Sequence, residues 1–206
     1  MRKALEGLCF LRRDAVPGAC VGFILAPLRW RAQEKLVKPT IAFLDCEASG
    51  LSGESWPIEV AYAASDGGAD EFLLSRQPEW SLEAWDRYSA RTHGISLADL
   101  EENGISAKAA IERLSILRNA VVVSDAAEFE NFWLGRLAQA AGAELPFTVV
   151  DWETVLPSDQ TREERDDLLK RARADEPRLH RAAPDSRVMR AVWRASWEKA
   201  HAAWAE

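Results

Sequence analysis

Two acidic side chains, Asp45 and Glu47, stand two residues apart in the segment Phe43-Leu-Asp-Cys-Glu-Ala-Ser-Gly-Leu51. Side chains two residues apart on a β-strand leave the same face, so both carboxylates face one way and Cys46 faces the other. The glycine turn that follows allows another backbone or a ligand to approach closely. Carboxylate oxygens placed in this way suit hard divalent cations such as Mg²⁺. The alternative is a pair of solvated acids on an edge strand.

Two acids further along the chain each begin an apolar helical stripe. Glu130 precedes apolar residues at offsets of 3, 4 and 7, and Asp185 precedes apolar residues at offsets of 4, 7 and 8. A carboxylate on an inward face needs a partner, because an isolated buried charge is strongly disfavoured. A metal ion is one such partner and an arginine is the other. Asp125 is a lower-ranked rival to Glu130 as a metal ligand, because the segment Asp125-Ala-Ala-Glu128 is typical of a helix N-cap with its capping-box glutamate.

A histidine precedes the last of these acids, in the segment His180-Arg-Ala-Ala-Pro-Asp185. Pro184 fits the first turn of a helix, where its missing N–H is not needed. His180 is therefore expected in the preceding loop and Asp185 at the start of the helix. An imidazole in that place can act as an acid or base beside anchored ligands, although a lone histidine is more often an ordinary surface or core residue.

The scaffold that must position these residues is predicted from hydrophobic periodicity and turn signals. Strands are expected over residues 40–44, 57–63, 71–74, 120–124 and 147–150, with a glycine-rich turn at 48–53. Helices are expected over 81–88, 106–117 and 128–141, from the capping box at Thr161-Arg-Glu-Glu164, and from about Pro184 to the end. His93-Gly94 is placed in a loop, and Phe129, Trp133 and Leu137 form one helical stripe. Three strands followed by strands that alternate with helices predict an α/β fold: a mixed five-stranded sheet, an antiparallel meander and then parallel strands, flanked by helices.

Length and charge define the domain organisation. The 206 residues are 48% hydrophobic and 29% charged, which suits one ordinary globular domain. Residues 1–38 carry 8 Lys and Arg against 3 Asp and Glu, whereas residues 39–206 carry 18 against 30. We therefore divide the chain into an N-terminal extension of unknown role (1–38) and a functional domain (39–206). The acidic domain argues against tight sequence-independent binding of long duplex DNA. Ten basic residues between Arg162 and Arg194 indicate either a track for phosphates or a solvated helical face.

Membrane insertion and export are not expected. The longest uncharged run, Ala15 to Leu28, contains two prolines and two glycines, so it is too short and too broken to span a bilayer as a helix. Charges at Glu6 and at Arg12-Arg13-Asp14 interrupt the apolar stretch that a signal peptide requires. Three cysteines without a CxxC pair suit a reducing compartment. The expected location is cytoplasmic.

The order of these motifs resembles the DEDDh branch of the 3'-to-5' exonucleases, the group that contains ribonuclease T and the proofreading subunit of bacterial replicative DNA polymerase. The resemblance covers roughly residues 40 to 200 and implies a ribonuclease H-like fold. The matching segments, in chain order, are Asp45 with Glu47, Gly50-Leu51, Ile58-Glu59-Val60, Thr92-His93-Gly94-Ile95, and His180 with Ala182 and Asp185. One position departs from the pattern: the chain has Phe129-Glu130 where the family has an aspartate after the aromatic residue.

The resemblance also implies a chemistry. It implies that two Mg²⁺ or Mn²⁺ ions would be held by Asp45, Glu47, Glu130 and Asp185, with Asp45 as the ligand expected to be shared by both ions. His180 would act as general base on the attacking water. The residues implied in substrate binding are Cys46, Ala48, Ser49, Leu51 and His93. The implied partners are the 3' ends of single-stranded or short RNA or DNA, and the implied products are nucleoside 5'-monophosphates. The alternative is a catalytically weakened module of the same fold that binds nucleic acid or a protein partner, because Glu130 replaces an aspartate and the domain is acidic.

Several tryptophans have two interpretations each. Trp56 is either a stacking platform for a base or a packing residue beside Pro57, and packing is favoured. Trp193, Trp197 and Trp204 fall near one stripe of the last helix, which indicates a core position or a homodimer surface.

Overall fold

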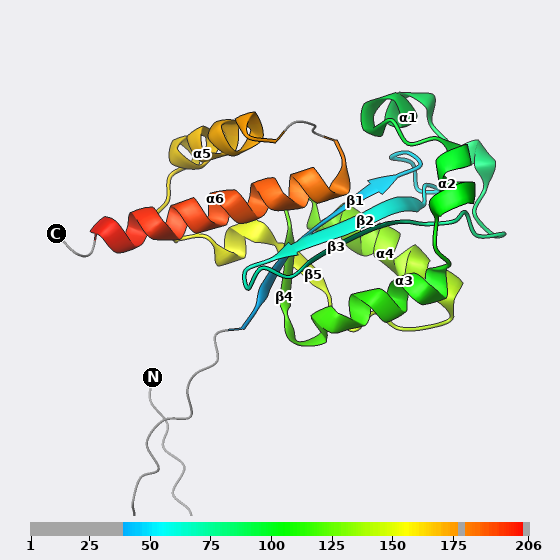
Figure 1. Cartoon of the computed structure of the whole chain (residues 1–206), viewed down its shortest axis with the longest axis horizontal. Coiled ribbons are helices and arrows are strands. Elements are labelled where there is room, and N and C mark those ends of the chain that lie inside the picture. Colours follow the sequence, from blue (N-terminus) through cyan, green and yellow to red (C-terminus); the bar gives the residue numbers. More distant parts are fainter. Residues whose placement is uncertain (1–38, 177–179, 204–206) are drawn as a thin grey trace, which may run out of the picture. The chain divides into compact units, whose positions relative to one another are not determined.

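The computed structural model describes residues 39–176 and 180–203. The predictions for residues 1–38 and for Trp204 lie outside the described residues. Within these ranges a five-stranded sheet forms the centre of the fold (Figure 1), with strand order β3-β2-β1-β4-β5. The strands are β1 (Ile41–Ala48), β2 (Pro57–Ala64), β3 (Ala69–Leu73), β4 (Val121–Ser124) and β5 (Val149–Asp151).

Strand directions follow the predicted pattern. β1 pairs antiparallel with β2, and β2 antiparallel with β3. β4 lies parallel to β1 on its other side, and β5 lies parallel to β4. The antiparallel meander followed by parallel strands is thereby confirmed. β1 runs past the apolar segment 40–44 to Ala48, so Asp45 and Glu47 lie on the strand as predicted, and the β2 partner continues alongside them.

Helices cover both faces of the sheet. They are α1 (Arg87–His93), α2 (Leu97–Asn103), α3 (Ala107–Leu114), α4 (Ala127–Ala141), α5 (Arg162–Ala174) and α6 (Ala182–Ala203), with short 3-10 helices η1 (Leu82–Ala84), η2 (Ser115–Asn119) and η3 (Trp152–Val155). α6 crosses one face of the sheet with α5 beyond it, whereas α3 and α4 lie on the other face (Figure 1). Among the described residues, no helix combines the length and the apolar character that a membrane crossing requires.

The alternation along β1 explains this layering. Ala42, Leu44 and Cys46 point into the larger core cluster beneath α3 and α4. Phe43 points the other way and packs with Met189 and Val192 of α6. Because Asp45 and Glu47 share the face of Phe43, they emerge on the side of the sheet that α6 covers.

The segment between β3 and α3 differs from the prediction. A helix was expected over 81–88, but the chain forms only η1 there, and α1 begins at Arg87. The reason is local: the carboxylate of Asp86 accepts hydrogen bonds from the backbone N–H groups of Tyr88 and Ser89, so Asp86 is the N-cap. His93 is the last residue of α1 rather than part of a loop, and Gly94 ends the helix with φ 69°. The following helix α2 was not predicted.

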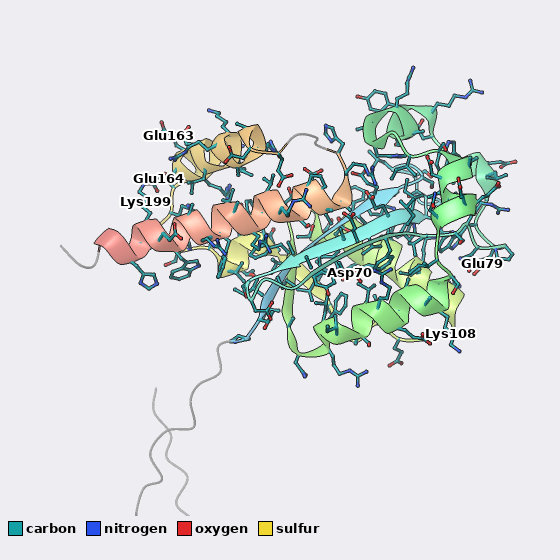
Figure 2. All side chains as sticks on the ribbon, in the orientation of Figure 1. Asp70, Glu79, Lys108, Glu163, Glu164 and Lys199 are labelled. Carbon is teal, nitrogen blue, oxygen red and sulfur yellow. The ribbon has the colours of Figure 1, made fainter. Side chains whose placement is uncertain are left out.

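The capping box before α5 is confirmed. The hydroxyl of Thr161 accepts from the backbone N–H of Glu164, whose carboxylate accepts in turn from the N–H of Thr161. Glu164 also pairs with Lys199 of α6, and Figure 2 labels the two residues where the helices lie side by side. The start of α5 is thus tied to α6.

The tryptophans with two interpretations are packing residues where the structure describes them. Trp56 is fully buried, and its ring stacks on Trp80 with centroids 5.4 Å apart, as the packing interpretation predicts. Trp193 packs against Phe43 at 5.7 Å between ring centroids. The indole N–H of Trp197 donates to the carbonyl of Val155 at 2.9 Å. Trp193 thus packs against the core cluster that contains Phe43, whereas Trp197 is half-buried, and a homodimer surface on this helix stays a prediction.

Gly104, at the end of α2, sits where two backbones meet. A Cβ built there would lie 2.4 Å from the carbonyl oxygen of Leu100 and 2.4 Å from the backbone nitrogen of Ser75. Gly104→Ala is therefore expected to destabilise the fold by about 2–4 kcal/mol, because the backbone must shift. Gly135→Ala in α4 is the control: an added Cβ there meets no other part of the described chain within 4 Å, and it should stabilise by about 0.5–1 kcal/mol. Urea unfolding measures both, and an unchanged midpoint for Gly104→Ala would contradict the packing described here.

Candidate active site

The carboxylates of Asp45 and Glu47 lie at the end of β1. In the register with β2, Asp45 faces Ala61 and Glu47 faces Glu59. The register shifts between Glu47 and Ala48, so regular pairing stops directly after the two acids. The strand therefore presents both side chains at the edge of the turn over residues 49–56.

Small side chains bring α6 close to this edge. Ala61 of β2 packs with Ala182 and Ala183 at the start of α6, and all three are buried. Asp185 follows in the first turn of α6. As a result, ligand oxygens of Asp45, Glu47 and Asp185 lie within 4.8 Å of one another.

A cavity of about 410 Å³ opens over these carboxylates. It is lined by every residue predicted to act in catalysis or metal binding, together with the rival: Asp45, Glu47, Asp125, Glu130, His180 and Asp185. The structure thus brings together side chains from β1, the end of β4, α4 and the start of α6.

A buried ion pair fixes the segment that carries His180. Glu59 of β2 is 3% exposed, and the guanidinium of Arg181 donates to both its carboxylate oxygens, with Nε 3.0 Å from Oε1 and 2.9 Å from Oε2. The backbone N–H of Ala182 donates to the same carboxylate at 2.9 Å. His180, directly before this anchor, is solvent-exposed and holds a left-handed φ of 59°. Such a φ is uncommon for a residue with a side chain, so the neighbouring contacts must impose it.

Glu130 lies deeper than the other acids. It is 1% exposed in the first turn of α4 and falls outside the group of three carboxylates within 4.8 Å. Burial raises the pKa of Glu130 to about 8, although hydrogen bonding with Cys46 opposes the shift. Its Oε2 atom is buried, and none of the described residues forms a hydrogen bond with it. The buried carboxyl group of Glu130 is stabilised if it is protonated, and therefore neutral, or if a cation lies beside it.

Asp125 does not cap α4, contrary to the expectation that lowered its rank. The N-cap is Ala126, whose methyl side chain cannot accept a hydrogen bond, and Asp125 lies one residue before it. Asp125 instead lines the cavity. Burial and then the charge of Asp185 raise the pKa of Asp125, whereas Arg173 of α5 lowers it. Asp125 thus stands beside Glu130 as a candidate fourth acid.

The donor set fits a hard divalent cation. Burial raises the pKa of Asp45 well above its ordinary value, and repulsion from Glu130, Glu47 and Asp185 adds to the shift. Side chains that supply only carboxylate oxygens, crowded so that they repel one another, form the environment that Mg²⁺ or Mn²⁺ neutralises. Asp45, Glu47 and Asp185 are the residues that would hold such an ion.

The residues predicted to bind substrate divide into two groups. Cys46 and Leu51 line the cavity, and Leu51 is 74% exposed. Ala48 and Ser49 are buried, and the N–H of Ser49 already donates to the carbonyl of Trp56 at 2.9 Å. His93 is 2% exposed at the end of α1, where its Nδ1 accepts from the N–H of Ile95. The structure does not bring Ala48, Ser49 or His93 into the lining.

Phe129 and Arg173 line the cavity although neither of them was predicted from the sequence to have a site role. Phe129 was placed on one helical stripe with Trp133 and Leu137, but it is 47% exposed and lines the cavity, as Leu51 does. Arg173 is the basic residue of α5 that lines the cavity, and it belonged to the basic run between Arg162 and Arg194. The position of Arg173 within that basic run was the sequence signal that could have identified it. Periodicity alone does not distinguish an arginine that lines a cavity from one on a solvated face.

Glu130 makes the stability of the metal-free protein depend on pH. A raised folded-state pKa means that the folded protein binds more protons than the unfolded one between about pH 4.5 and 8, so stability falls as pH rises through this range. In EDTA, the decrease in the free energy of unfolding between pH 5 and pH 7.5 should be about 2 kcal/mol smaller for Glu130→Gln than for the wild type. Urea unfolding at the two pH values measures it, with Glu128→Gln on the exposed side of α4 as control. Parallel pH profiles for wild type and Glu130→Gln would contradict the burial of this carboxyl group.

Comparisons with known proteins support the architecture. No protein-family model matches the chain, and no curated protein matches it. Solved structures do match: E. coli exonuclease I with a dT13 oligonucleotide is 13% identical with a TM-score of 0.58, over 79% of this chain and 41% of that chain. The zinc-bound E. coli exonuclease I complex with single-stranded DNA is 15% identical with a TM-score of 0.59, over 79% and 41%. A product-bound exonuclease I is 11% identical with a TM-score of 0.57, over 78% and 44%.

These matches establish the fold. The chain has the mixed five-stranded sheet and flanking helices of exonuclease I, and the predicted ribonuclease H-like architecture is confirmed. It spans less than half the length of the exonuclease I chains that it matches. The three clustered carboxylates fit the acidic set implied by the resemblance to DEDDh exonucleases.

Proposed function

We propose that the protein is a metal-dependent 3'-to-5' exonuclease that hydrolyses phosphodiester bonds at the 3' end of single-stranded or short RNA or DNA. The products would be nucleoside 5'-monophosphates. The observation that carries the proposal is the convergence of Asp45, Glu47 and Asp185 within 4.8 Å in a cavity on an exonuclease I fold. E. coli exonuclease I has been solved with dT13 and dA16 oligonucleotides, which makes a DNA strand the first substrate to test.

The carboxylates would act as ligands for Mg²⁺ or Mn²⁺. Asp45, Glu47 and Asp185 are the proposed ligands, and Glu130 or Asp125 is the proposed fourth. Two such ions, when bound, stabilise charge on the attacking and leaving oxygens of a phosphoryl displacement.

His180 is the proposed general base. Its imidazole lines the cavity from the loop before α6 and is exposed, so it is accessible to an attacking water. A ring nitrogen of the neutral imidazole would accept the proton of that water as the new P–O bond forms. The bond from phosphorus to the 3' oxygen of the preceding nucleotide would break at the same time, and that oxygen would take a proton from solvent and leave as the new 3' hydroxyl group. The Glu59–Arg181 pair, directly after His180 in the chain, holds the backbone from which the ring projects.

Leu51 and Phe129 are proposed to contact the terminal base. Both are exposed apolar side chains at the rim of the cavity, at 74% and 47%. Contact with a flat base would remove their apolar surface from water without reading its sequence. Cys46 lines the cavity floor, and the implied roles of Ala48, Ser49 and His93 remain predictions.

The test is degradation of a 5'-labelled single strand by the purified full chain in Mg²⁺ or Mn²⁺. We expect a ladder shortened from the 3' end that disappears with EDTA. Matched RNA and DNA strands determine which sugar is preferred, since selection for RNA depends on contacts to the 2'-OH. Intact strands in both metals would contradict the proposal.

One observation favours the weakened-module alternative. Glu130 replaces an aspartate of the family pattern, and in the structure it lies outside the group of three clustered carboxylates. Glu130→Asp separates the two hypotheses, because a large gain of nuclease activity identifies a degenerate site. Unchanged, robust activity identifies the wild-type site as functional. The homodimer prediction is separate, and analytical ultracentrifugation tests it.

A further inference from the structure

The short helix α1 is fastened to the turn beside the carboxylates. The backbone N–H of Asp86, its N-cap, donates to the carbonyl of Ser49 at 2.7 Å. Gly50 packs so closely that a Cβ there would lie 3.2 Å from both the Ala84 carbonyl oxygen and the Asp86 Cβ. Ser49 is two residues after Glu47, so α1 starts next to the candidate active site.

This helix presents unpaired positive charge in an acidic domain. Arg87 and Arg91 are one turn apart and therefore share a face. Both are exposed, and within the described part of the chain neither forms a salt bridge. Asp86, next to Arg87 in the chain, uses its carboxylate to accept from the N–H groups of Tyr88 and Ser89. The charge of Arg91 also lowers the pKa of Asp86, but by less than those hydrogen bonds do.

A cavity of about 480 Å³ lies beside the two arginines, between α1 and the start of α2. Its lining is otherwise neutral, with Trp85, Ile95 and Leu97 among its members. On the adjoining side of the helix, Tyr88 is 72% exposed and lies three residues before Arg91. Proteins bind single-stranded nucleic acids with positive charges that contact the phosphate backbone and with exposed aromatic rings on which bases stack. The two guanidinium groups and the tyrosine ring supply both.

We propose that Arg87, Arg91 and Tyr88 form a docking surface for the phosphate backbone and bases of a single strand whose 3' end lies at the carboxylates. This inference rests on the proposed function for the identity of the strand. Its support is the fastening of α1 to the active-site turn, together with charge complementarity. In a domain with 30 acidic and 18 basic residues, an anion is attracted only where arginines are free of acidic partners.

The test measures binding without cleavage. Fluorescence anisotropy of fluorescein-labelled dT12 is recorded in EDTA with the full chain, over a series of salt concentrations. Arg87→Ala/Arg91→Ala should weaken binding about tenfold and reduce the slope of log Kd against log salt by about 1.4, which is about 0.7 for each lost phosphate contact. Tyr88→Ala should weaken binding about fivefold or more and leave the salt slope unchanged.

The matched control is Lys108→Ala/Arg118→Ala, which removes two exposed positive charges from α3 and η2. Lys108 lies on α3, away from α1 in Figure 2, and Arg118 precedes β4, whose far end carries Asp125. This control should bind dT12 as the wild type does. Equal losses in both double variants, or a wild-type Kd and slope for Arg87→Ala/Arg91→Ala, would overturn the docking surface.

A second substrate separates this inference from the proposed function. The p-nitrophenyl ester of thymidine 5'-monophosphate has a single phosphate, the one to be hydrolysed, and no further strand for α1 to bind. Its metal-dependent hydrolysis should be the same in wild type and in Arg87→Ala/Arg91→Ala. Absence of hydrolysis in the wild type contradicts the proposed function, whereas the anisotropy result decides the docking surface by itself.

Discussion

Asp45→Asn is expected to lower the rate of metal-dependent strand cleavage by about a thousandfold, because charge stabilisation by bound metal is worth several kcal/mol. The same change should stabilise the metal-free protein. Burial and four neighbouring acids disfavour the charged form of Asp45, so a neutral amide of the same shape relieves that cost. A gain of about 1 kcal/mol corresponds to about 2–4 °C in Tm for a chain of this size. Cleavage assays and thermal unfolding in EDTA measure the two effects.

The opposite signs of these effects make the prediction specific. A variant that lost activity through misfolding would also lose Tm. Asp70→Asn is a suitable control, since Asp70 on β3 pairs with Arg113 at the surface rather than with the acidic cluster. It should retain wild-type activity. A variant Asp45→Asn that cleaves at the wild-type rate would contradict the assignment of Asp45 as a metal ligand.

Glu59→Ala is expected to destabilise the fold by about 2–3 kcal/mol and to reduce activity by at least tenfold. Glu59 is buried, and its removal leaves the guanidinium of Arg181 and the N–H of Ala182 without their acceptor. The stability figure lies below that of a fully buried pair because the Arg181 side chain is 34% exposed. Activity falls because the pair anchors the segment that carries His180 and Asp185.

The control for Glu59→Ala is a variant that breaks a surface ion pair. Asp70→Ala breaks the Arg113 pair, whose side chains are 41% and 25% exposed, and should cost about 1 kcal/mol or less. Urea unfolding gives the stabilities, and Mn²⁺ affinity reports on the position of Asp185 independently of turnover. If Glu59→Ala keeps wild-type Mn²⁺ affinity and activity at a temperature where it is folded, the pair has no positioning role.

The sequence was sufficient for the sheet and for the three clustered acids. Alternation places Asp45 and Glu47 on one face of β1, and the proline at the start of α6 places Asp185 in its first turn. Both signals are local, so they can be recognised without knowledge of the tertiary structure. The same is true of the capping box at Thr161.

Other features depend on contacts between distant residues. A pairing between Glu59 and Arg181 joins positions 122 residues apart, and nothing in either local sequence indicates it. The ranking of Glu130 above Asp125 relied on a capping pattern that the chain does not use, because Ala126 and not Asp125 is the N-cap of α4. Phe129 shares the helical spacing of Trp133 and Leu137, yet it is 47% exposed and lines the cavity, whereas Trp133 and Leu137 are buried. Periodicity defines a face of a helix but not what covers that face.

The most direct test of the account is calorimetric titration of the full chain with Mn²⁺. The central claim is that carboxylates from β1 and α6 together hold divalent ions. We predict saturable binding to the wild type that is lost in Asp45→Asn/Asp185→Asn and retained in Asp70→Asn. Absence of binding to the wild type, or equal binding to the Asp45→Asn/Asp185→Asn variant, would contradict it.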